Sequence, residues 1–309
     1  MRVALFGQGV MGTRHARTLR SRGDVTDLRI YDADPGRRTH ETPEQVLEGA
    51  GAAVIAAPAG THAGLLELCA EHGVPVFCEK PIATDLEEAI RVVEVLRGHD
   101  AVTQIGFQRR FDDGFRAARE DLRSGRLGTP RSFTIATFDR TPPPPAYVAG
   151  SGGIFRDMHV HDFDTVRWLF GEEIEEVWAA GSALGDPVFA ENDDIDVSGV
   201  VVRLAGGAVG AIAGSRQNPD GYLARLEVYG DQASHVLPQP RSYRDFLDRY
   251  DEAYGRELAC FIEVASGKRP SPCTVFDGLE SLRVAVAAER ARRGGAGVRV
   301  AAVPGLGAG

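Results

Sequence analysis

The chain has 309 residues, and its 43% hydrophobic and 26% charged residues are typical of a globular protein long enough for two domains. With 35 basic and 44 acidic residues, the formal charge of −9 argues against a nucleic-acid partner, so a small molecule is the expected ligand. No apolar run approaches the roughly 18 residues of a membrane span, and the start of the chain has no secretory pattern. We therefore expect no membrane contact and a cytoplasmic location.

The four cysteines, at positions 69, 78, 260 and 273, form no C-x-x-C pair and lack the spacing of a zinc site. We interpret them as free thiols that pack as small hydrophobic side chains in a reducing compartment. No metal is expected.

Residues 1 to 122 alternate short β-rich runs with helical patterns, which predicts a Rossmann domain, a doubly wound parallel sheet built from βαβ units. The expected strands are residues 3–6, 28–31, 53–57, 74–78 and 102–107, and clear helical patterns cover 61–71 and 85–96. The second of these helices begins with Thr84-x-x-Glu87, a plausible capping box.

A G-x-G-x-x-G motif, Gly7-Gln8-Gly9-Val10-Met11-Gly12, follows the first strand and leads into a helical stretch. Alone the motif is weak, but in this context the N–H groups at the helix start can bind a pyrophosphate. Asp32 ends the second strand, where a carboxylate accepts hydrogen bonds from the adenosine ribose and repels a 2′-phosphate. The pattern predicts NAD. Arg37 and Arg38 lie nearby, so NADP is not excluded.

A second motif, Glu79-Lys80-Pro81, follows the strand at 74–78, at the sheet edge where open α/β folds bind ligands. There Lys80 can hydrogen-bond a reacting hydroxyl and stabilise an alkoxide as it forms. A cis bond before Pro81 would fix the direction of the lysine. Taken alone, a lysine after a strand is more often a surface residue.

From residue 123 to 309 the pattern changes to a C-terminal α+β domain with a largely antiparallel open sheet. Its expected strands are residues 131–138, 176–182, 196–204, 208–215, 224–230 and 298–300. Gly206-Gly207 is typical of a hairpin turn, and long helical patterns cover 243–265 and 275–292. We leave open whether residues 275–302 pack back on the Rossmann domain, and we expect the Gly/Ala/Pro tail to be disordered.

Between these strands, Asp157, His161 and Asp164 fall on one side of a predicted helix, at positions i, i+4 and i+7. An apolar stripe lies opposite, which mounts the helix on a core. His159 faces elsewhere. A histidine beside a carboxylate can accept a proton near neutral pH. A solvated helix face explains the row equally well from the pattern alone.

In this order, the glycine motif, Asp32, Pro58-x-x-x-His62, Glu79-Lys80-Pro81 and Asp157-x-x-x-His161 resemble the glucose-fructose oxidoreductase/inositol dehydrogenase/MocA family over nearly the whole chain. The resemblance implies Lys80, Asp157 and His161 as the catalytic group. It also implies that Pro58, His62 and Glu79 lie by the nicotinamide cofactor. The open second sheet is then a subunit interface, which implies a homodimer or homotetramer.

Within that family, Gly106-Phe107-Gln108-Arg109-Arg110-Phe111-Asp112 and the segment 152–164 look most like inositol 2-dehydrogenases. The likeness implies that Asp164 and Tyr222 contact hydroxyls of the substrate, with Arg109 as a further substrate-binding residue or, equally well, part of a structural ion pair. The chain departs from the pattern at Ala57-Pro58-Ala59-Gly60, where Thr-Pro-Asn is common, and at Thr141, about where some of these enzymes have asparagine.

The resulting hypothesis is reversible oxidation of a secondary hydroxyl on a cyclitol or sugar, with myo-inositol and its 2-keto product as the first choice. A dehydrogenase or reductase of the same family that acts on another sugar or an aminocyclitol is the alternative. A cofactor-binding homologue without catalysis, and a metal-dependent hydrolase that uses Asp157, His159, His161 and Asp164, are more distant alternatives. Helical geometry disfavours the hydrolase, because His159 and His161 point apart.

Overall fold

A computed structural model describes residues 1–239 and 241–302 and divides the chain into two compact units. Unit 1 contains Met1–Phe107 and Tyr254–Leu279, and unit 2 contains Gln108–Ala253 and the chain from Glu280 on. The expected domains are 1–122 and 123–309, with a return of 275–302 to the first domain left open. The segment that joins unit 1 is Tyr254–Leu279, and the division into domains stays a prediction. Most of the tail that we expected to be disordered lies outside the described residues.

Unit 1 contains the predicted parallel sheet, with strand order β2-β1-β3-β4-β5. Every residue of β3, β4 and β5 is buried, as expected for a parallel sheet covered on both faces. The chain passes from β1 to β2 on one side and places β3 on the other, so β1 lies at the point where the strand order reverses. The strands are β1 (Arg2–Phe6), β2 (Asp27–Tyr31), β3 (Ala52–Ile55), β4 (Val76–Glu79) and β5 (Thr103–Gly106).

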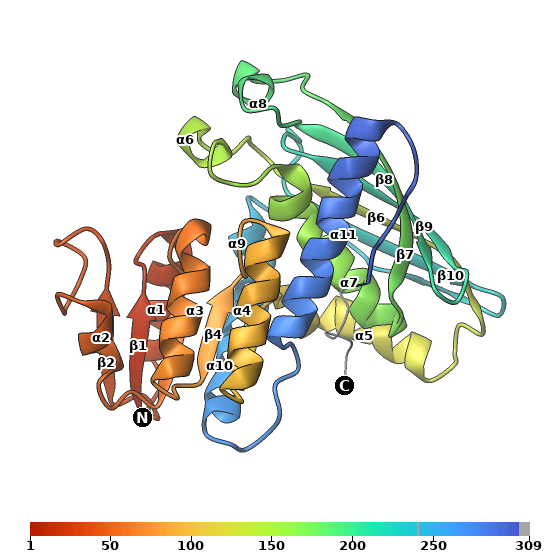
Figure 1. The fold of residues 1–309 in the computed structure, drawn as a ribbon. Coiled ribbons are helices and arrows are strands. Elements are labelled where there is room, and N and C mark those ends of the chain that lie inside the picture. The colour runs from red at the N-terminus through yellow and green to blue at the C-terminus, as the bar shows by residue number, and fades with distance from the viewer. Residues whose placement is uncertain (240, 303–309) are drawn as a thin grey trace. The chain divides into compact units, whose positions relative to one another are not determined.

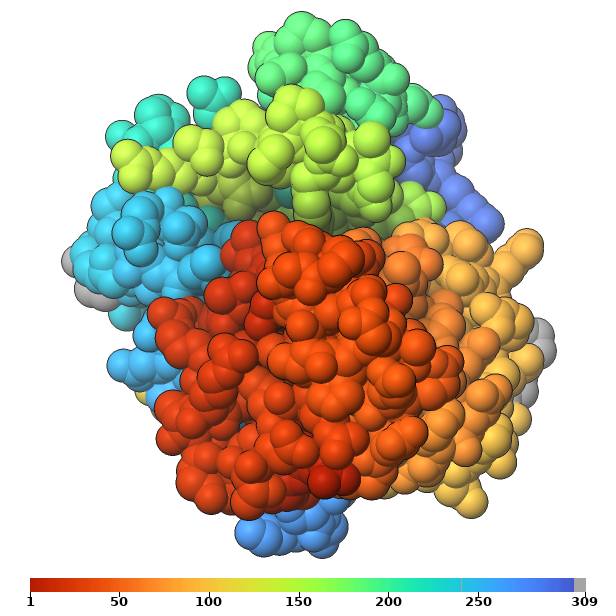
Figure 2. All heavy atoms as spheres, turned by 90° about the vertical axis from the view of Figure 1, so that its left-hand side faces the viewer, coloured from red at the N-terminus to blue at the C-terminus, as the bar shows by residue number. Residues whose placement is uncertain are grey.

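Helices cover both faces of this sheet. α1 (Val10–Arg20) and the end of α10 (Asp251–Ala265) share one core with β1, to which α10 contributes Leu258, Phe261 and Ile262. α3 (His62–Glu71) and α4 (Leu86–Gly98) lie side by side (Figure 1). The short elements of the unit are α2 (Pro43–Leu47) and η1 (Ala59–Thr61). Figure 2 views the unit from the β2 edge, where its first residues form a continuous surface.

The start of α4 differs by one residue from the expected capping box at Thr84. Asp85 is the N-cap, and its carboxylate accepts a hydrogen bond of 2.9 Å from the backbone N–H of Glu88. Threonine and aspartate both cap helices, and the aspartate occupies the extended backbone position that the cap requires. The box predicted the presence of the helix but not its first residue.

Unit 2 contains a seven-stranded sheet in the order β11-β10-β6-β9-β8-β7-β12. All neighbours are antiparallel except β6 and β9, which run parallel. β8 and β9 form the expected hairpin, in which Gly207 has a φ of +93°. The strands are β6 (Pro130–Phe138), β7 (Ile174–Ser182), β8 (Val197–Leu204), β9 (Val209–Ser215), β10 (Leu223–Gly230), β11 (Ser234–Val236) and β12 (Val298–Arg299).

One face of this sheet is buried and the other is open. Along β6, β8 and β9 buried residues alternate with exposed or half-buried ones, the pattern of a sheet with one covered face. α5 (Asp113–Arg123) and α7 (Val160–Phe170) contact each other at the covered side, and no helix of the described residues lies on the other side (Figure 1). β12 pairs with β7, so this strand belongs to the second sheet.

Two helical predictions in this half were wrong in detail. The pattern at 243–265 becomes helical only at Phe246, because Tyr243 is held in an extended bridge with Tyr222. It is then broken at Tyr250 into α9 (Phe246–Arg249) and α10. The segment around Asp157 begins as a π-helix, η3 (Phe155–His159), and only then becomes α7. The remaining elements of the unit are η2 (Gln108–Phe111), α6 (Pro145–Val148), α8 (Pro187–Glu191) and most of α11 (Val275–Gly294).

The four cysteines are buried free thiols, as predicted. Burial raises the pKa of the Cys78 thiol well above its usual range, which keeps it protonated. Among the residues that the structure describes, no helix combines the length and the apolar character that a membrane crossing requires.

Candidate active site

The glycine motif forms a tight turn between β1 and α1. Gly7 has a φ of +89°, and a Cβ there would lie 2.6 Å from the carbonyl oxygen of Ala56. A Cβ on Gly12 would lie 2.0 Å from the carbonyl oxygen of Gly7. These two glycines therefore allow the turn to pack against the end of β3 and the helix to pack against the turn.

Gly9 differs from the other two glycines, because a Cβ on it would meet no described atom within 4 Å. It is the N-cap of α1, where no side chain of the described residues caps the helix and the first turn contains no acid. Val10 is 67% exposed, and Met11 follows it half-buried. The backbone N–H groups at this helix start thus face open space with a positive dipole end, which fits a pyrophosphate.

Asp32 lies beside this turn, as predicted. Its carboxylate accepts hydrogen bonds from the backbone N–H groups of Gln8, at 2.6 Å, and Asp34, at 2.8 Å. A carboxylate fixed at the end of β2 suits a ribose diol and repels a 2′-phosphate. Arg37 pairs with Asp34 at 3.2 Å and Arg38 pairs with Glu41, so both arginines already have acidic partners. The residues fit NAD.

Lys80 stands at the carboxyl end of β4, and the Lys80–Pro81 peptide bond is cis, as predicted. His62 joins this strand end to the turn at Pro58. Its Nδ1 lies 2.7 Å from the carbonyl oxygen of Pro81, and its Nε2 lies 2.8 Å from that of Ala57. Burial lowers the pKa of His62, against the two carbonyl oxygens that favour the charged ring. His62 is therefore a buried link, and the expected contact with the cofactor stays a prediction.

Glu79 is held inside unit 1. Its Oε1 lies 2.7 Å from Nε2 of His15, a buried residue of α1. A Cβ on Gly106 would lie 2.9 Å from Oε2 of Glu79, so the glycine at the end of β5 leaves room for the carboxylate. The pair ties the glycine-motif helix to the strand that carries Lys80.

In unit 2, Asp157 lies in the π-turn η3 with two strong partners. The hydroxyl of Tyr147 donates to its Oδ1 at 2.8 Å, and the guanidinium of Arg216 lies 2.8 Å from its Oδ2. His161 follows in the first turn of α7 and is partly exposed. A π-turn contains an extra residue, so the regular i, i+4 spacing assumed from the sequence does not hold here, and such turns are frequent at functional sites.

Asp164 and Arg109, both expected to bind substrate, lie in buried ion pairs. Asp164 is 1% exposed, and its two oxygens accept from the guanidinium of Arg110 at 2.6 and 3.0 Å. Arg109 is 2% exposed, lies 2.5 Å from Asp162 and donates to the hydroxyl of Thr137 at 2.8 Å. Ion pairing was the alternative prediction for Arg109. Direct contact of either residue with substrate stays a prediction, and the ion pair that already holds each side chain disfavours it.

His159 points away from the Asp157 side, as predicted, into a buried polar cluster. Its Nδ1 lies 2.7 Å from Asp162 and its Nε2 lies 2.7 Å from the hydroxyl of Ser198 on β8. The ring is stacked on Phe155 with a centroid distance of 5.7 Å. These contacts anchor the π-turn to the sheet.

Tyr222, the remaining predicted substrate residue, is 4% exposed and meets Tyr250 edge to face at 6.1 Å. Its backbone N–H donates to the carbonyl of Tyr243 at 2.8 Å. Burial raises the pKa of the Tyr222 phenol well above its usual range, so the hydroxyl remains neutral.

Comparison with known proteins assigns both parts of the chain to one family. Residues 1–107 match the model of the oxidoreductase family with an NAD-binding Rossmann fold, and residues 115–236 match the GFO/IDH/MocA C-terminal domain. The chain is 33% identical to the myo-inositol 2-dehydrogenase of Thermotoga maritima, over 94% of this chain and 96% of that protein. The chain belongs to the GFO/IDH/MocA oxidoreductase family.

Two other members of the family cover the same length. The inositol 2-dehydrogenase of Rhizobium meliloti is 34% identical over 94% of this chain and 96% of its own. A crystal structure of a myo-inositol dehydrogenase from Corynebacterium glutamicum matches with a TM-score of 0.87 and 30% identity, covering 98% of this chain and 99% of that one. Both units thus belong to one GFO/IDH/MocA enzyme, and the family resemblance read from the motifs is confirmed.

For this GFO/IDH/MocA member, sequence reasoning missed the partners of Asp157, Tyr147 and Arg216. Arg216 directly follows β9, and Asp139 directly follows β6, the parallel neighbour of β9, in which Phe138 pairs with Ser215. The two residues therefore meet at one carboxyl edge, where their side chains lie 3.5 Å apart. The motifs do not indicate that Arg216 and Asp139 meet, because the sequence did not predict the parallel pairing of the two distant strands that precede them.

Proposed function

We propose that this enzyme oxidises a secondary hydroxyl of a cyclitol, first of all C2 of myo-inositol, to the ketone, with NAD as the acceptor. The observation that carries the proposal is the common edge of the first sheet. Lys80 follows β4 and the glycine turn follows β1, with only β3 between them, so the two lie roughly 10 Å apart. The full-length similarity to inositol 2-dehydrogenases supports the substrate class.

In the proposed reaction, bound NAD supplies the acceptor for the hydride at C4 of its nicotinamide. His161 takes the hydroxyl proton, and Asp157 stabilises the imidazolium that results. Lys80 donates a hydrogen bond to the substrate oxygen as negative charge develops. Tyr147 and Arg216 donate to the two oxygens of Asp157 and hold the carboxylate in place. Tyr222 holds a neighbouring hydroxyl, whereas Asp164 and Arg109 support the site through their ion pairs.

A polyol panel read by NADH absorbance tests this function. We expect turnover with myo-inositol, and a faster reaction with an aminocyclitol or a hexose would point to the alternative activity within the family. NAD binding without turnover on any polyol would instead favour a non-catalytic homologue.

The Lys80→Met variant tests the role of the lysine. It should lower kcat by about 10²- to 10³-fold, the loss typical of a missing transition-state donor. Its NAD affinity, measured by calorimetry, should stay near that of the wild type. Lys268→Met is the matched control, because Lys268 is the other lysine of the chain and is exposed. Loss of NAD binding alone in Lys80→Met would contradict the role.

We further propose that the chain works as a homotetramer through the open face of the second sheet, in the cytoplasm. The strand register aligns Trp178, Val201, Ala211 and Thr134 across β7, β8, β9 and β6. Trp178 is 40% and Val201 41% exposed, an apolar strip of the kind that mediates association. Four free cysteines suit a reducing compartment.

Light scattering tests the assembly. Val201→Glu should reduce the mass to that of a smaller species, because the new charge would be buried at the interface. Leu184→Glu, at a side chain that is 78% exposed and outside the strands, is the control. Equal masses for all three proteins would exclude this face as the interface.

A further inference from the structure

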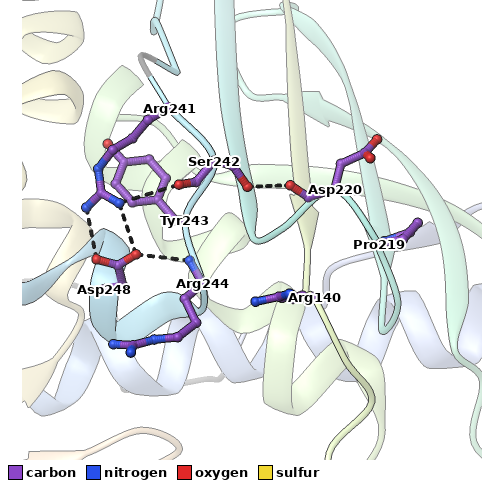
Figure 3. Close-up of a pocket in the computed structure, with 8 residues that line it drawn as sticks. All are labelled: Arg140, Pro219, Asp220, Arg241, Ser242, Tyr243, Arg244 and Asp248. Carbon is purple, nitrogen blue, oxygen red and sulfur yellow. Dashed lines mark hydrogen bonds and ion pairs between the residues drawn. The ribbon is translucent and has the colours of Figure 1, made fainter.

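A pocket of about 360 Å³ opens in unit 2 where three loops meet (Figure 3). Arg140 comes from the chain just after β6, Asp220 from the loop between β9 and β10, and residues 241–244 from the loop before α9. The volume lies in the range of pockets that hold small ligands. None of the roles assigned above uses this pocket.

Hydrogen bonds between the loops build its walls. Tyr243 and Tyr222 form an antiparallel bridge, and the Ser242 hydroxyl donates to the backbone carbonyl of Asp220. Asp248 binds the guanidinium of Arg241 at 2.9 and 3.1 Å and also accepts from the backbone N–H of Arg244 at 3.0 Å. The pocket is therefore a framed feature and not a gap between loose loops.

The charge of the lining is positive, although the chain as a whole carries −9. Arg241 and Asp248 neutralise each other, and the hydrogen bond from Arg241 lowers the pKa of Asp248 to about 2, so the pair stays charged. The carboxylate of Asp220 points away from the arginines (Figure 3). Among the described residues, the one ion-pair contact of Arg244 is at 3.5 Å, with the partly exposed Asp245.

Arg140 provides the surplus charge. Among residues 1–239 and 241–302, no carboxylate lies within ion-pair distance of its guanidinium. An arginine presents a planar fork of donors that matches a phosphate or a carboxylate. Tyr243 adds an aromatic wall, whose ring is stacked against the guanidinium of Arg241 at 4.3 Å. The lining thus suits an oxyanion attached to a small polar body.

We propose that this pocket binds the phosphate or carboxylate group of a small ligand, with Arg140 as its main anchor and Arg244 as a second donor. The pocket adjoins the proposed substrate residues. Tyr243 is bridged to Tyr222, and Asp139, next to Arg140 in the chain, shares Arg216 with Asp157. The anion is either a substituent of the substrate or a separate effector, and the kinetic distinction between the two rests on the proposed function.

Calorimetry of the full chain with inorganic phosphate tests the site directly, at constant ionic strength against chloride. We expect saturable binding that weakens at least tenfold in Arg140→Ala and less in Arg244→Ala. Arg131→Ala is the matched control, because Arg131 lies on β6, the strand that precedes Arg140, is 66% exposed and pairs with Asp231. Equal phosphate binding in Arg140→Ala and Arg131→Ala, or no saturable binding to the wild type, would overturn the proposal.

Kinetics with NAD then separates the two sources. If the anion belongs to the substrate, Arg140→Ala raises KM for a myo-inositol monophosphate and leaves KM for myo-inositol unchanged. If it is an effector, inorganic phosphate shifts KM for myo-inositol in the wild type but not in Arg140→Ala. Both results support the site. Because calorimetry needs no turnover, an inactive protein that binds phosphate would count against the proposed function alone.

Discussion

Two groups of acids and histidines share the short segment from Asp157 to Asp164, and they have opposite surroundings. His159 and Asp162 are fully buried. Their contacts form a line that runs from Ser198 through His159 and Asp162 to Arg109. Asp157 lies at the boundary of burial, 9% exposed, and His161 is partly exposed. The same residue types are therefore fully buried at His159 and Asp162 and lie closer to solvent at Asp157 and His161.

The buried group shows that a catalytic site needs more than the right residues in hydrogen-bonding distance of one another. Ser198, His159 and Asp162 are joined at 2.7 Å each, the sequence of contacts found in a serine hydrolase triad. The hydroxyl belongs to a residue only 7% exposed, on the covered face of the sheet. Access, and not distance, separates the two groups.

The largest expected effect comes from His161→Ala, which should lower kcat by about 10²- to 10⁴-fold through loss of the general base. The melting temperature should change little, because the ring is partly exposed. Turnover with NAD and the best polyol of the panel measures the first quantity, and thermal unfolding measures the second.

His159→Gln is the matched control for that variant. It should keep most of the turnover and lose stability, because the amide cannot satisfy both Asp162 and Ser198 at 2.7 Å. Turnover near wild type in His161→Ala, together with a large loss in His159→Gln, would reverse the assignment of the two histidines.

The next effect is on stability. Asp162→Ala should cost about 3–5 kcal/mol in the free energy of unfolding, because it leaves the Arg109 charge buried without its partner. Urea unfolding measures this cost. Asp231→Ala, which removes a half-exposed partner of Arg131, should cost far less, because that pair is open to solvent.

Acid should reproduce part of the Asp162 effect. Burial raises the pKa of Asp162, but the Arg109 charge and the His159 contact outweigh burial and hold the pKa at about 2, below the ordinary 3.8. The carboxylate therefore contributes stability that is complete above pH 3.8 and is lost as the pH falls toward 2. Stability curves of the wild type and Asp162→Ala should converge over this window. Parallel curves would contradict the pKa assignment.

The sequence predicted the fold and the backbone geometry in the nucleotide half of the candidate site, because that information is local. The roles of the residues there stay predictions. A glycine turn after a strand, an acid at the end of β2 and a lysine after β4 each depend on short-range geometry, and the parallel sheet fixes where strand ends meet. The substrate half depends on long-range partners. Whether Asp164 meets solvent or Arg110 is decided by a residue more than fifty positions away.

The π-turn at Phe155–His159 shows the same limit at the level of the backbone. Helical periodicity predicted that His159 faces away from the row of Asp157, His161 and Asp164, but it could not show that an extra residue enters the turn before His161. That insertion is stabilised by the contacts of His159 with Ser198 and Asp162, which come from tertiary packing.

Asp164→Asn would test the boundary between the two groups. If Asp164 acts only as the partner of Arg110, the substitution should lower the free energy of unfolding by about 2 kcal/mol. KM for the polyol should then change less than threefold. A direct substrate contact, the role expected from the resemblance, would instead raise KM by about tenfold at unchanged stability. Steady-state kinetics and urea unfolding on one preparation distinguish the two results.

The smallest expected effect concerns the support of Asp157. Tyr147→Phe removes only the hydroxyl that donates to Asp157 at 2.8 Å, and Arg216 remains in place as the second partner. Stability should fall by about 1 kcal/mol and kcat by less than tenfold, because one of two charge-assisted contacts is lost. Tyr229→Phe is the control, since its hydroxyl donates at 2.6 Å to Glu227 on the open sheet face. If both variants kept full turnover, Arg216 alone would suffice to hold Asp157, and the catalytic group would depend on one cation from the end of β9.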